Sequence, residues 1–208
     1  MTHPQEPYQH LWNERYRNEQ FIFGTEPNEF VRSMAQHFIP SGQTLAIAEG
    51  EGRNAIYLAE LGHHLTCWDY SEVGLAKCHQ LAAQRKVEVD TRCINLLDVD
   101  WAQERNHWDQ VICIFGHFPP ELRQQTLAGV KQAIRPGGYY LSEVYSTSQL
   151  DYGTGGPKDA ELLYRPQYLL DAFADWSIIH FFMGEVLRNE GIGHQGLSHV
   201  IQILAQHK

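Results

Sequence analysis

Short apolar runs alternate with longer segments of helical spacing along most of this chain. The short runs predict strands near residues 44–48, 64–68, 88–93, 109–115 and 137–144. The longer segments predict helices near residues 53–61, 71–84 and 120–134. Such alternation requires crossover connections between strands. The sequence therefore predicts a mostly parallel sheet with helices on both faces.

The two ends of the chain depart from this alternation. Residues 177–182 and 199–204 are apolar segments with no helix between them, so we expect them to pair as an antiparallel hairpin. Residues 1–40 are rich in aromatic side chains and predict a helical N-terminal cap. Because no internal repeat or low-complexity linker divides the chain, we expect one domain over residues 1–208.

Composition limits the possible functions. Of the 208 residues, 43% are hydrophobic, which is enough to bury one core. The formal net charge of −9 argues against nucleic-acid binding, because phosphate contacts need clustered Lys and Arg. No apolar run approaches the roughly 20 residues that span a bilayer. The polar N-terminus has no signal-peptide core, so we expect a cytoplasmic protein without a membrane partner.

Cysteine and histidine spacing gives no sign of a metal site. The four cysteines have no C-x-x-C spacing and lie mostly in or beside apolar segments, which favours buried free thiols. No H-E-x-x-H or comparable motif occurs. We therefore expect no bound metal.

Two glycines separate the first predicted strand from the helix that follows it. Gly50 and Gly52 lack side chains, so the backbone can turn sharply and a ligand can lie against it. Asp69 stands roughly twenty residues further on, at the end of the second predicted strand, where a carboxylate can accept hydrogen bonds from ribose hydroxyls. This order of strand, turn, helix and acid predicts a pocket for a nucleoside.

The residues beside the glycines separate two classes of cofactor. A dinucleotide site needs a third glycine near position 55, where Ala55 stands, and room for a pyrophosphate at the helix N-terminus. Glu49 and Glu51 would repel phosphates and suit a cationic ligand. S-adenosylmethionine carries a sulfonium and an ammonium group, so it fits this turn better.

Further motifs follow in a recognisable order. Asn95 and Leu96 come after the third predicted strand, residues 108–114 form the fourth, and Arg-Pro-Gly-Gly at 135–138 precedes the fifth. With the glycine turn and the acid, this order resembles the class I S-adenosylmethionine-dependent methyltransferases. The resemblance implies a Rossmann-like methyltransferase fold, which is an α/β, doubly wound, mostly parallel seven-stranded sheet ending in the antiparallel hairpin.

Both ends of the chain narrow the resemblance. Leu-Trp-Asn-Glu-Arg-Tyr at 11–16, Phe-Gly-Thr-Glu-Pro-Asn at 23–28 and the glycine-rich hairpin at 190–196 look like the tellurite-resistance and thiol or thiopurine methyltransferase branch. That branch implies a small-molecule methyl acceptor, either a thiol or a metalloid oxyanion. A general base is needed only if the nucleophile arrives protonated. For the assembly we expect a monomer or a homodimer.

The first motif departs from the family pattern. The family usually has Asp-x-Gly-x-Gly-x-Gly, whereas Ala46 holds the Asp position here and Ala48 that of the first Gly. We expect the turn to tolerate the one added methyl. Glu49 is then a candidate to supply the missing carboxylate near the amino-acid end of the cofactor.

The residues assigned to the cofactor come from the cap, the glycine turn and the strand ends. Either Trp12 or Tyr16 is expected to close over the sulfonium and exclude water. Tyr70 is a candidate for stacking on the adenine, and the resemblance implies adenine contacts from Asn95 and Leu96. The predicted cofactor-binding residues are Trp12, Tyr16, Gly24, Glu49, Gly50, Glu51, Gly52, Asp69, Tyr70, Ser71, Asn95, Leu96 and Phe115.

The candidates for catalysis and acceptor binding lie further along the chain. His117 comes just after the fourth predicted strand, where an open α/β sheet places its ligand crevice, and is a candidate base. Tyr145, after the fifth strand, is expected to face the same crevice. Residues 152–158 are rich in glycine but lack a phosphate-loop context, so we predict a substrate lid within residues 145–170. The predicted substrate-binding residues are Tyr152, Arg188 and His194.

Three alternatives stay open. A nicotinamide-dependent oxidoreductase would need the third glycine and a catalytic Tyr-x-x-x-Lys motif, neither of which the chain has. A non-catalytic protein that binds S-adenosylmethionine or S-adenosylhomocysteine is compatible with the altered first motif. A nucleic-acid methyltransferase is disfavoured by the acidic charge and by the lack of an Asn/Asp-Pro-Pro-Tyr/Phe motif.

Overall fold

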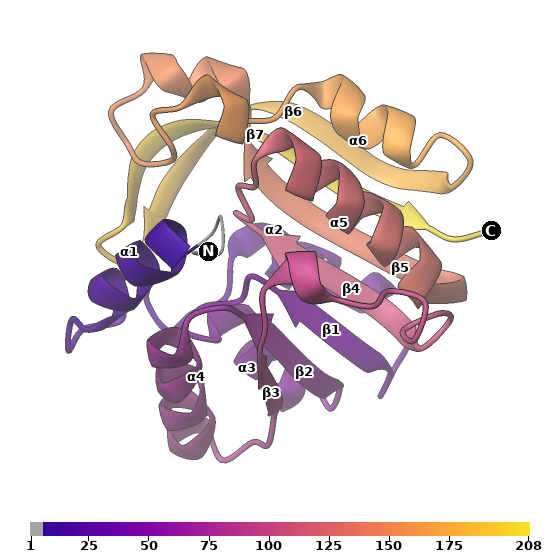
Figure 1. Ribbon diagram of the computed structural model, residues 1–208, viewed down its shortest axis with the longest axis horizontal. Helices are drawn as coiled ribbons and strands as arrows, with labels where there is room; N and C mark the ends of the chain where they lie inside the picture. The colour runs from indigo at the N-terminus through magenta and orange to yellow at the C-terminus, as the bar shows by residue number, and fades with distance from the viewer. Residues whose placement is uncertain (1–5) are drawn as a thin grey trace.

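The fold is built on one seven-stranded sheet, and the computed structural model describes residues 6–208. The strand order is β3-β2-β1-β4-β5-β7-β6 (Figure 1). The strands are β1 Gln43–Ile47, β2 His64–Asp69, β3 Asp90–Cys93, β4 Trp108–Ile114, β5 Ile134–Tyr145, β6 Ser177–Glu190 and β7 His194–Gln206. The first five strands run parallel, whereas β7 pairs antiparallel with both β5 and β6. The predicted parallel sheet and C-terminal hairpin are confirmed.

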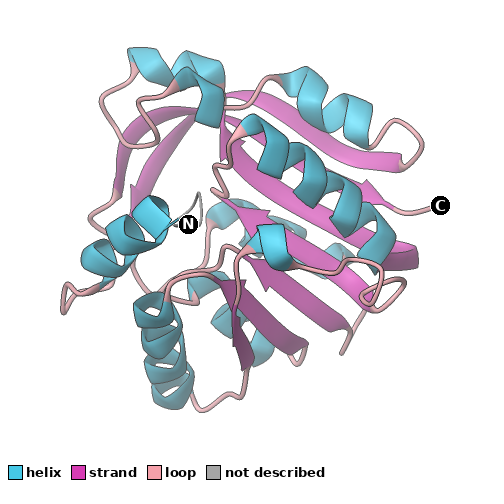
Figure 2. Ribbon diagram, in the orientation of Figure 1, coloured by secondary structure: helices cyan, strands magenta, loops and turns pink. Residues whose placement is uncertain are grey.

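Helices connect the parallel strands, as the alternating pattern predicted (Figure 2). The α-helices are α1 Glu6–Tyr16, α2 Glu29–Met34, α3 Arg53–Glu60, α4 Glu72–Arg85, α5 Pro120–Ala133 and α6 Pro166–Ala172. Short 3-10 helices follow α2 at Ala35–His37 and occur at Leu96–Asp98, Thr147–Asp151 and Ala160–Leu162. Ser71 caps the N-terminus of α4, because its hydroxyl accepts the amide hydrogen of Gly74 at 3.1 Å.

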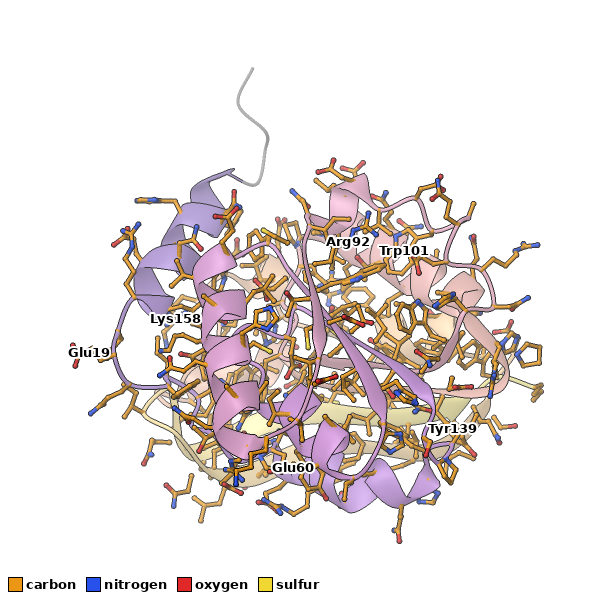
Figure 3. All side chains as sticks on the ribbon, turned by 90° about the horizontal axis from the view of Figure 1, so that it is seen from below. Glu19, Glu60, Arg92, Trp101, Tyr139 and Lys158 are labelled. Carbon is orange, nitrogen blue, oxygen red and sulfur yellow. The ribbon has the colours of Figure 1, made fainter. Side chains whose placement is uncertain are left out.

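The sheet is the middle of three layers, and two apolar cores lie on its two faces. On one face, side chains of α2, α3 and α4 pack on alternate strand residues such as Ala46 and Ile112. On the other face, α5 and α6 pack on residues such as Leu45 and Val111. Adjacent strand residues belong to opposite cores because strand side chains alternate between faces. Figure 3 shows the side chains that fill these layers, including Trp101, which packs against Gly129 of α5.

Three parts of the chain differ from the sequence prediction. Helix α6 was not predicted, because its seven residues are too few to show a clear helical repeat. The hairpin strands are longer than predicted, since polar residues continue them beyond the apolar segments. Residues 135–138 lie within β5 as a bulge between the pairs Trp108–Ile134 and Gln110–Tyr139, rather than as a turn before it.

The N-terminal helix lies across the carboxyl edge of the sheet. In Figure 1, α1 is seen between α4 and the far end of the β6–β7 hairpin. Two hydrogen bonds hold it there: Gln9 Nε2 donates to the Tyr70 carbonyl at 2.6 Å, and Ser71 Oγ donates to Asn13 Oδ1 at 2.5 Å. Helix α1 therefore covers the place where the crevice was predicted. Within residues 6–208, no helix has the length and apolar character needed to cross a membrane.

Candidate active site

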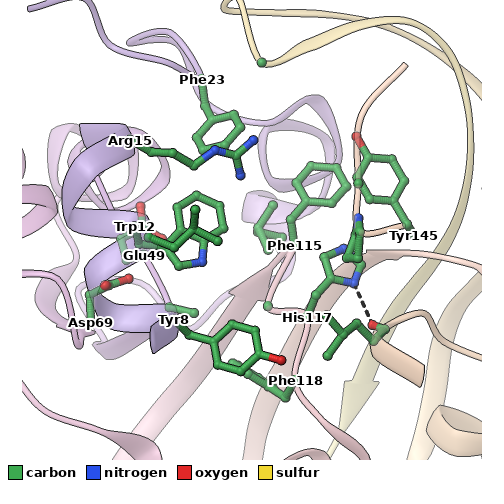
Figure 4. Close-up of a pocket in the computed structure, with 18 of the residues that line it drawn as sticks. Tyr8, Trp12, Arg15, Phe23, Glu49, Asp69, Phe115, His117, Phe118 and Tyr145 are labelled. Carbon is green, nitrogen blue, oxygen red and sulfur yellow. Dashed lines mark hydrogen bonds between the residues drawn. The ribbon is translucent and has the colours of Figure 1, made fainter. Parts of the chain in front are cut away.

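A cavity of about 540 Å³ opens at the carboxyl ends of β1, β2, β4 and β5. The predicted site residues that line it are Trp12, Tyr16, Glu49, Asp69, Tyr70, Leu96, Phe115, His117, Tyr145 and His194. In the described chain, the predicted residues that lie outside this lining are Gly24, Gly50, Glu51, Gly52, Ser71, Asn95, Tyr152 and Arg188. Figure 4 shows Glu49 and Asp69 on one side of Phe115, and His117 and Tyr145 on the other. We call these the carboxylate end and the histidine end of the cavity.

The two glycines of the turn lie beside the cavity without lining it. Gly50 and Gly52 have φ angles of 60° and 89°, which side chains rarely adopt. The space that their missing side chains leave is filled by protein, because a Cβ on Gly50 would meet the Tyr16 hydroxyl and one on Gly52 would meet the sulfur of Cys78. The glycines therefore let Tyr16 and α4 approach the turn, where the sequence prediction expected a ligand.

Asp69 holds the glycine turn to the second strand. Its Oδ2 accepts the amide hydrogen of Gly50 at 2.9 Å, and its Oδ1 accepts that of Ser71 at 2.8 Å. Burial raises the pKa of Asp69 to about 6, although these amide hydrogen bonds act in the opposite direction. A carboxylate oxygen can accept a second hydrogen bond. Asp69 therefore keeps acceptor capacity toward the cavity that it lines.

Glu49 accepts hydrogen bonds from the first turn of α3 as well as lining the cavity. Its Oε1 accepts the amide hydrogens of Asn54 at 3.0 Å and Ala55 at 2.9 Å, at a helix whose N-cap Gly52 has no capping side chain. Burial raises the pKa of Glu49 to about 7, while these amides and the Arg53 charge act to lower it. The carboxyl group can thus gain or lose its proton near neutral pH.

Ala48 carries strain in the turn. Its φ angle is 52°, in the left-handed region where a Cβ costs about 1–3 kcal/mol. The family pattern has glycine here, as the sequence indicated. The turn accepts the methyl group, as expected, but at a conformational cost, and Ala48 also lines the cavity.

Glu51 faces away from the cavity and fixes the loop that follows α1. Its Oε2 accepts the amide hydrogens of Ile22 at 2.8 Å and Phe23 at 3.4 Å. Its Oε1 pairs with Lys77 Nζ at 2.5 Å, and the same ammonium group donates to the carbonyls of Asn18 and Gln20. The structure thus gives this predicted cofactor residue a supporting position.

Aromatic side chains from the cap roof the cavity. The rings of Trp12 and Tyr16 lie 5.3 Å apart, and Trp12 is 6.2 Å from Phe23. Tyr16 is only 6% exposed and packs on Gly50 and Gly74, whereas Trp12 is half-buried with the Arg15 guanidinium 4.9 Å from its ring. Of the two predicted roof residues, Trp12 therefore retains more freedom to close on a ligand. Gly24, with a φ angle of 76°, lies against Gly191 of the hairpin turn.

Tyr70 and Leu96 complete the carboxylate end, and both line the cavity. Asn95 instead begins the 3-10 helix at Leu96–Asp98, where its Oδ1 accepts the Leu97 amide hydrogen at 3.0 Å. Ser71 is fully buried beneath α1. Asn95 and Ser71 therefore shape the wall of the cavity from behind.

Aromatic and imidazole rings form the histidine end. Phe115 lies 4.7 Å from Tyr145 and 4.3 Å from His194, and it also has a positive φ angle of 55°. The His117 ring is stacked on Tyr145 at 5.4 Å and an interplanar angle of 12°. Its Nδ1 lies 3.0 Å from the Leu162 carbonyl (Figure 4). Burial lowers the pKa of His117 to about 4, so the ring is neutral at neutral pH.

Arg188 belongs to a buried ion-pair network behind this end. Its guanidinium contacts Glu143 at 2.5 Å and Glu190 at 2.8 Å, and Glu190 also pairs with Arg53 at 2.6 Å. Asn28 Nδ2 donates to Glu143 at 2.7 Å. The side chains of Arg188 and Glu143 are 1% and 0% exposed. Arg188 is thus neither a solvated surface residue nor a lining residue. It fixes β6 to β5, and Glu190 links the hairpin to Arg53 directly after the glycine turn.

Arg53 is a charged lining residue that the sequence analysis missed. It lines the cavity at the first position of α3, is 6% exposed, and its Nη1 is buried without a hydrogen-bond partner among residues 6–208. A positive charge at a helix N-terminus is unfavourable to the helix dipole. That mismatch, directly after the glycine pair, was the signal in the sequence that could have identified Arg53.

The predicted lid segment lines the cavity with residues other than the expected tyrosine. Gly153, Gly155 and residues 156–159 line the histidine end. Tyr152 points elsewhere, because its hydroxyl donates to Glu185 on β6 at 2.6 Å. The glycine-rich stretch therefore lies over the cavity, and Tyr152 attaches it to the hairpin.

A methyltransferase family profile and a curated methyltransferase both match the sequence of this chain. A family profile described as a methyltransferase domain matches residues 44–138. The probable S-adenosyl-L-methionine-dependent methyltransferase TehB of Haemophilus influenzae is 24% identical over 178 residues, which are 84% of this chain and 60% of that protein. The chain thus spans less than two thirds of the length of this relative.

Solved structures share the fold. The crystal structure of TehB from Haemophilus influenzae matches with a TM-score of 0.68 at 20% identity, covering 96% of this chain and 67% of that one. A structure described under the conversion of a disulfide bond into a thioacetal group during echinomycin biosynthesis matches with a TM-score of 0.76 at 18% identity, covering 97% and 93%. The matches confirm the predicted resemblance to the methyltransferases and the fold that goes with it.

Proposed function

Because the chain carries the domain and the fold of the class I S-adenosylmethionine-dependent methyltransferases, we propose that it transfers the cofactor's methyl group to a small organic acceptor. The observation that carries this proposal is the single cavity with two unlike ends. Buried carboxyl groups line one end, and neutral rings line the other. Methyl transfer needs this division, because a cationic donor and a nucleophile must meet in line with water excluded.

The carboxylate end suits S-adenosylmethionine. Asp69 offers acceptor positions for the ribose hydroxyls, and the cationic part of the cofactor favours ionised Glu49. Nη1 of Arg53, which has no hydrogen-bond partner in the described part of the chain, is available for the cofactor's carboxylate. The residues present therefore fit each charged group of this cofactor.

The histidine end suits an uncharged acceptor better than a metalloid oxyanion. The guanidinium groups of Arg53 and Arg188 are already paired with the buried carboxylates of Glu190 and Glu143. Arg15 and Lys158 are the remaining cations of the lining, whereas the rings of this end replace none of the hydration of an oxyanion. A thiol, the other acceptor class that the family resemblance implies, can pack its sulfur on rings such as Phe115.

Calorimetry and turnover together test the proposal. We expect S-adenosylmethionine and S-adenosylhomocysteine to bind in titration calorimetry and NAD not to bind. We expect S-adenosylhomocysteine to form from S-adenosylmethionine when a panel of thiols and phenols is supplied. Tight cofactor binding with no turnover across the panel would favour the non-catalytic binding protein instead, and binding of NAD alone would favour the oxidoreductase.

A further inference from the structure

Building on the proposed function, we infer that the acceptor is an uncharged planar molecule whose nucleophilic atom still carries its proton, and that Nε2 of His117 takes this proton. Two features of the site carry the inference: the hydrogen bond made by the other ring nitrogen, and the aromatic surroundings of the imidazole.

The Leu162 carbonyl fixes the tautomer of His117. A carbonyl oxygen accepts hydrogen bonds and cannot donate them, so Nδ1, which lies 3.0 Å from it, carries the ring proton. In a neutral imidazole the other nitrogen is then an acceptor with a free lone pair. Nε2 is buried and has no hydrogen-bond partner within the described residues. His117 therefore places in the wall of the cavity a base that no group among residues 6–208 uses.

Arg123 secures this arrangement from outside the cavity. Its Nη1 donates to the carbonyls of Glu161 and Leu163, both at 3.2 Å. Glu161 and Leu163 flank Leu162 in the sequence. The two hydrogen bonds therefore hold the turn in which the Leu162 carbonyl faces His117. Arg123 is 4% exposed. We assign it as a positioning residue, because it acts on the reaction through the orientation of the imidazole.

The surroundings of His117 select the shape and charge of the acceptor. Tyr145 is stacked on the imidazole, Phe115 lies nearly parallel at 6.3 Å, and Phe118 lines the same cavity. Flat aromatic walls favour a planar ligand. An anionic acceptor would leave the Nε2 lone pair facing negative charge. An acceptor with O–H, N–H or S–H instead satisfies that lone pair.

The chemical step balances in atoms and charge. The acceptor's lone pair forms the new bond to the methyl carbon as the sulfur–methyl bond breaks, and the electron pair of that bond stays on the sulfur of S-adenosylhomocysteine. The acceptor's proton passes to Nε2, which gives an imidazolium whose Nδ1 proton still faces the Leu162 carbonyl. The site loses the sulfonium charge as it gains the imidazolium charge. Its total charge is therefore unchanged, so protonation of a buried imidazole becomes possible at this moment.

Two acceptors and one substitution test the inference. Phenol keeps its proton at neutral pH, whereas benzenethiol is largely ionised and needs no base. His117→Asn retains a side-chain N–H for the Leu162 carbonyl and removes Nε2. We expect kcat/KM for phenol to fall by about 10²–10⁴ in this variant, and that for benzenethiol by a much smaller factor. Similar losses with both acceptors would overturn the inference.

Independent readouts separate this inference from the proposed function. The dissociation constant for S-adenosylmethionine should be nearly the same in wild type and variant, and His117→Gln provides a second variant if the first does not fold. Nitrogen NMR of histidine-labelled protein at pH 7 should show His117 as the neutral Nδ1–H tautomer, and an Nε2–H tautomer would overturn the inference. Turnover of benzenethiol or selenite but not of phenol would contradict this inference and leave the proposed function standing. Cofactor binding without turnover of any acceptor would contradict the proposed function too.

Discussion

At the scale of single residues, the carboxylate end is defined by two acids held away from water. Burial raises the pKa of Asp69 to about 6 and that of Glu49 to about 7, above their ordinary values of 3.8 and 4.5. The folded protein therefore holds more protons than the unfolded chain between about pH 4 and pH 7. In the ligand-free protein, stability from these groups is greatest below pH 4 and is lost as the pH rises through 6 and 7.

Cofactor affinity should have the opposite pH dependence. A sulfonium favours the ionised acids, so we expect the affinity for S-adenosylmethionine to rise between about pH 5.5 and 7.5. S-adenosylhomocysteine has no sulfonium and should show a shallower rise. Calorimetry with both ligands across this range, on wild type and Glu49→Gln, gives the comparison. If the affinities for the two ligands had parallel pH profiles, or if the slope were unchanged in the variant, Glu49 would not interact with the cofactor.

At the scale of elements, an ion pair attaches the loop after α1 to the glycine turn. The side chains of Lys77 on α4 and Glu51 are 10% and 3% exposed, and Lys77 also holds two carbonyls of that loop. Removing one partner of a buried pair leaves the other charge unpaired. The loop and α1 would then lose their attachment to α4.

We therefore expect Lys77→Met to lower the free energy of unfolding by about 3–5 kcal/mol. The dissociation constant for S-adenosylmethionine should rise as well, because the roof residues of α1 depend on this loop. Lys131→Met, which breaks the exposed pair with Asp175, is the matched control and should cost less than about 1 kcal/mol. Urea denaturation and calorimetry measure both effects. Equal losses of unfolding free energy in the two variants would contradict the attachment of the loop through Lys77.

At the scale of the whole molecule, the buried network of Arg188 joins segments that are distant in the sequence. It links Glu143 on β5 and Arg188 on β6 to Glu190 at the end of β6, and continues to Arg53 at the start of α3. Burial alone would raise the pKa of Glu190, but His194, Arg53 and Arg188 together lower it. The network thereby fixes the hairpin turn, including His194, against the cavity.

Removal of Arg188 should affect the entire fold. With Arg188→Met, Glu143 keeps a fully buried charge without its cation, so we expect a loss of about 3–5 kcal/mol of stability. Arg92→Met is the control, because the Arg92 side chain is 54% exposed in its pair with Glu104. Thermal melting compares the two variants. If Arg188→Met has the same melting temperature as wild type, the network does not stabilise the hairpin.

The sequence alone determined the architecture of this protein. Alternating apolar runs gave the parallel strands and their helices, because periodicity is a local property of the chain. The carboxyl ends of parallel strands share one edge, so the positions of Asp69, Phe115, His117 and Tyr145 along the chain were enough to place them on one cavity. Short elements such as α6 left too little pattern to detect.

Tertiary structure decided which side chains face the cavity and which support it. Glu49 and Glu51 are two residues apart and chemically alike, yet one lines the cavity and the other pairs with Lys77. Arg188 follows a polar pattern typical of a surface, but it is buried in ion pairs with Glu190 on its own strand and with Glu143 on the distant strand β5. Partners from remote segments set the direction and ionisation of each side chain. No local pattern records them, so only the folded chain could separate binding residues from supporting ones.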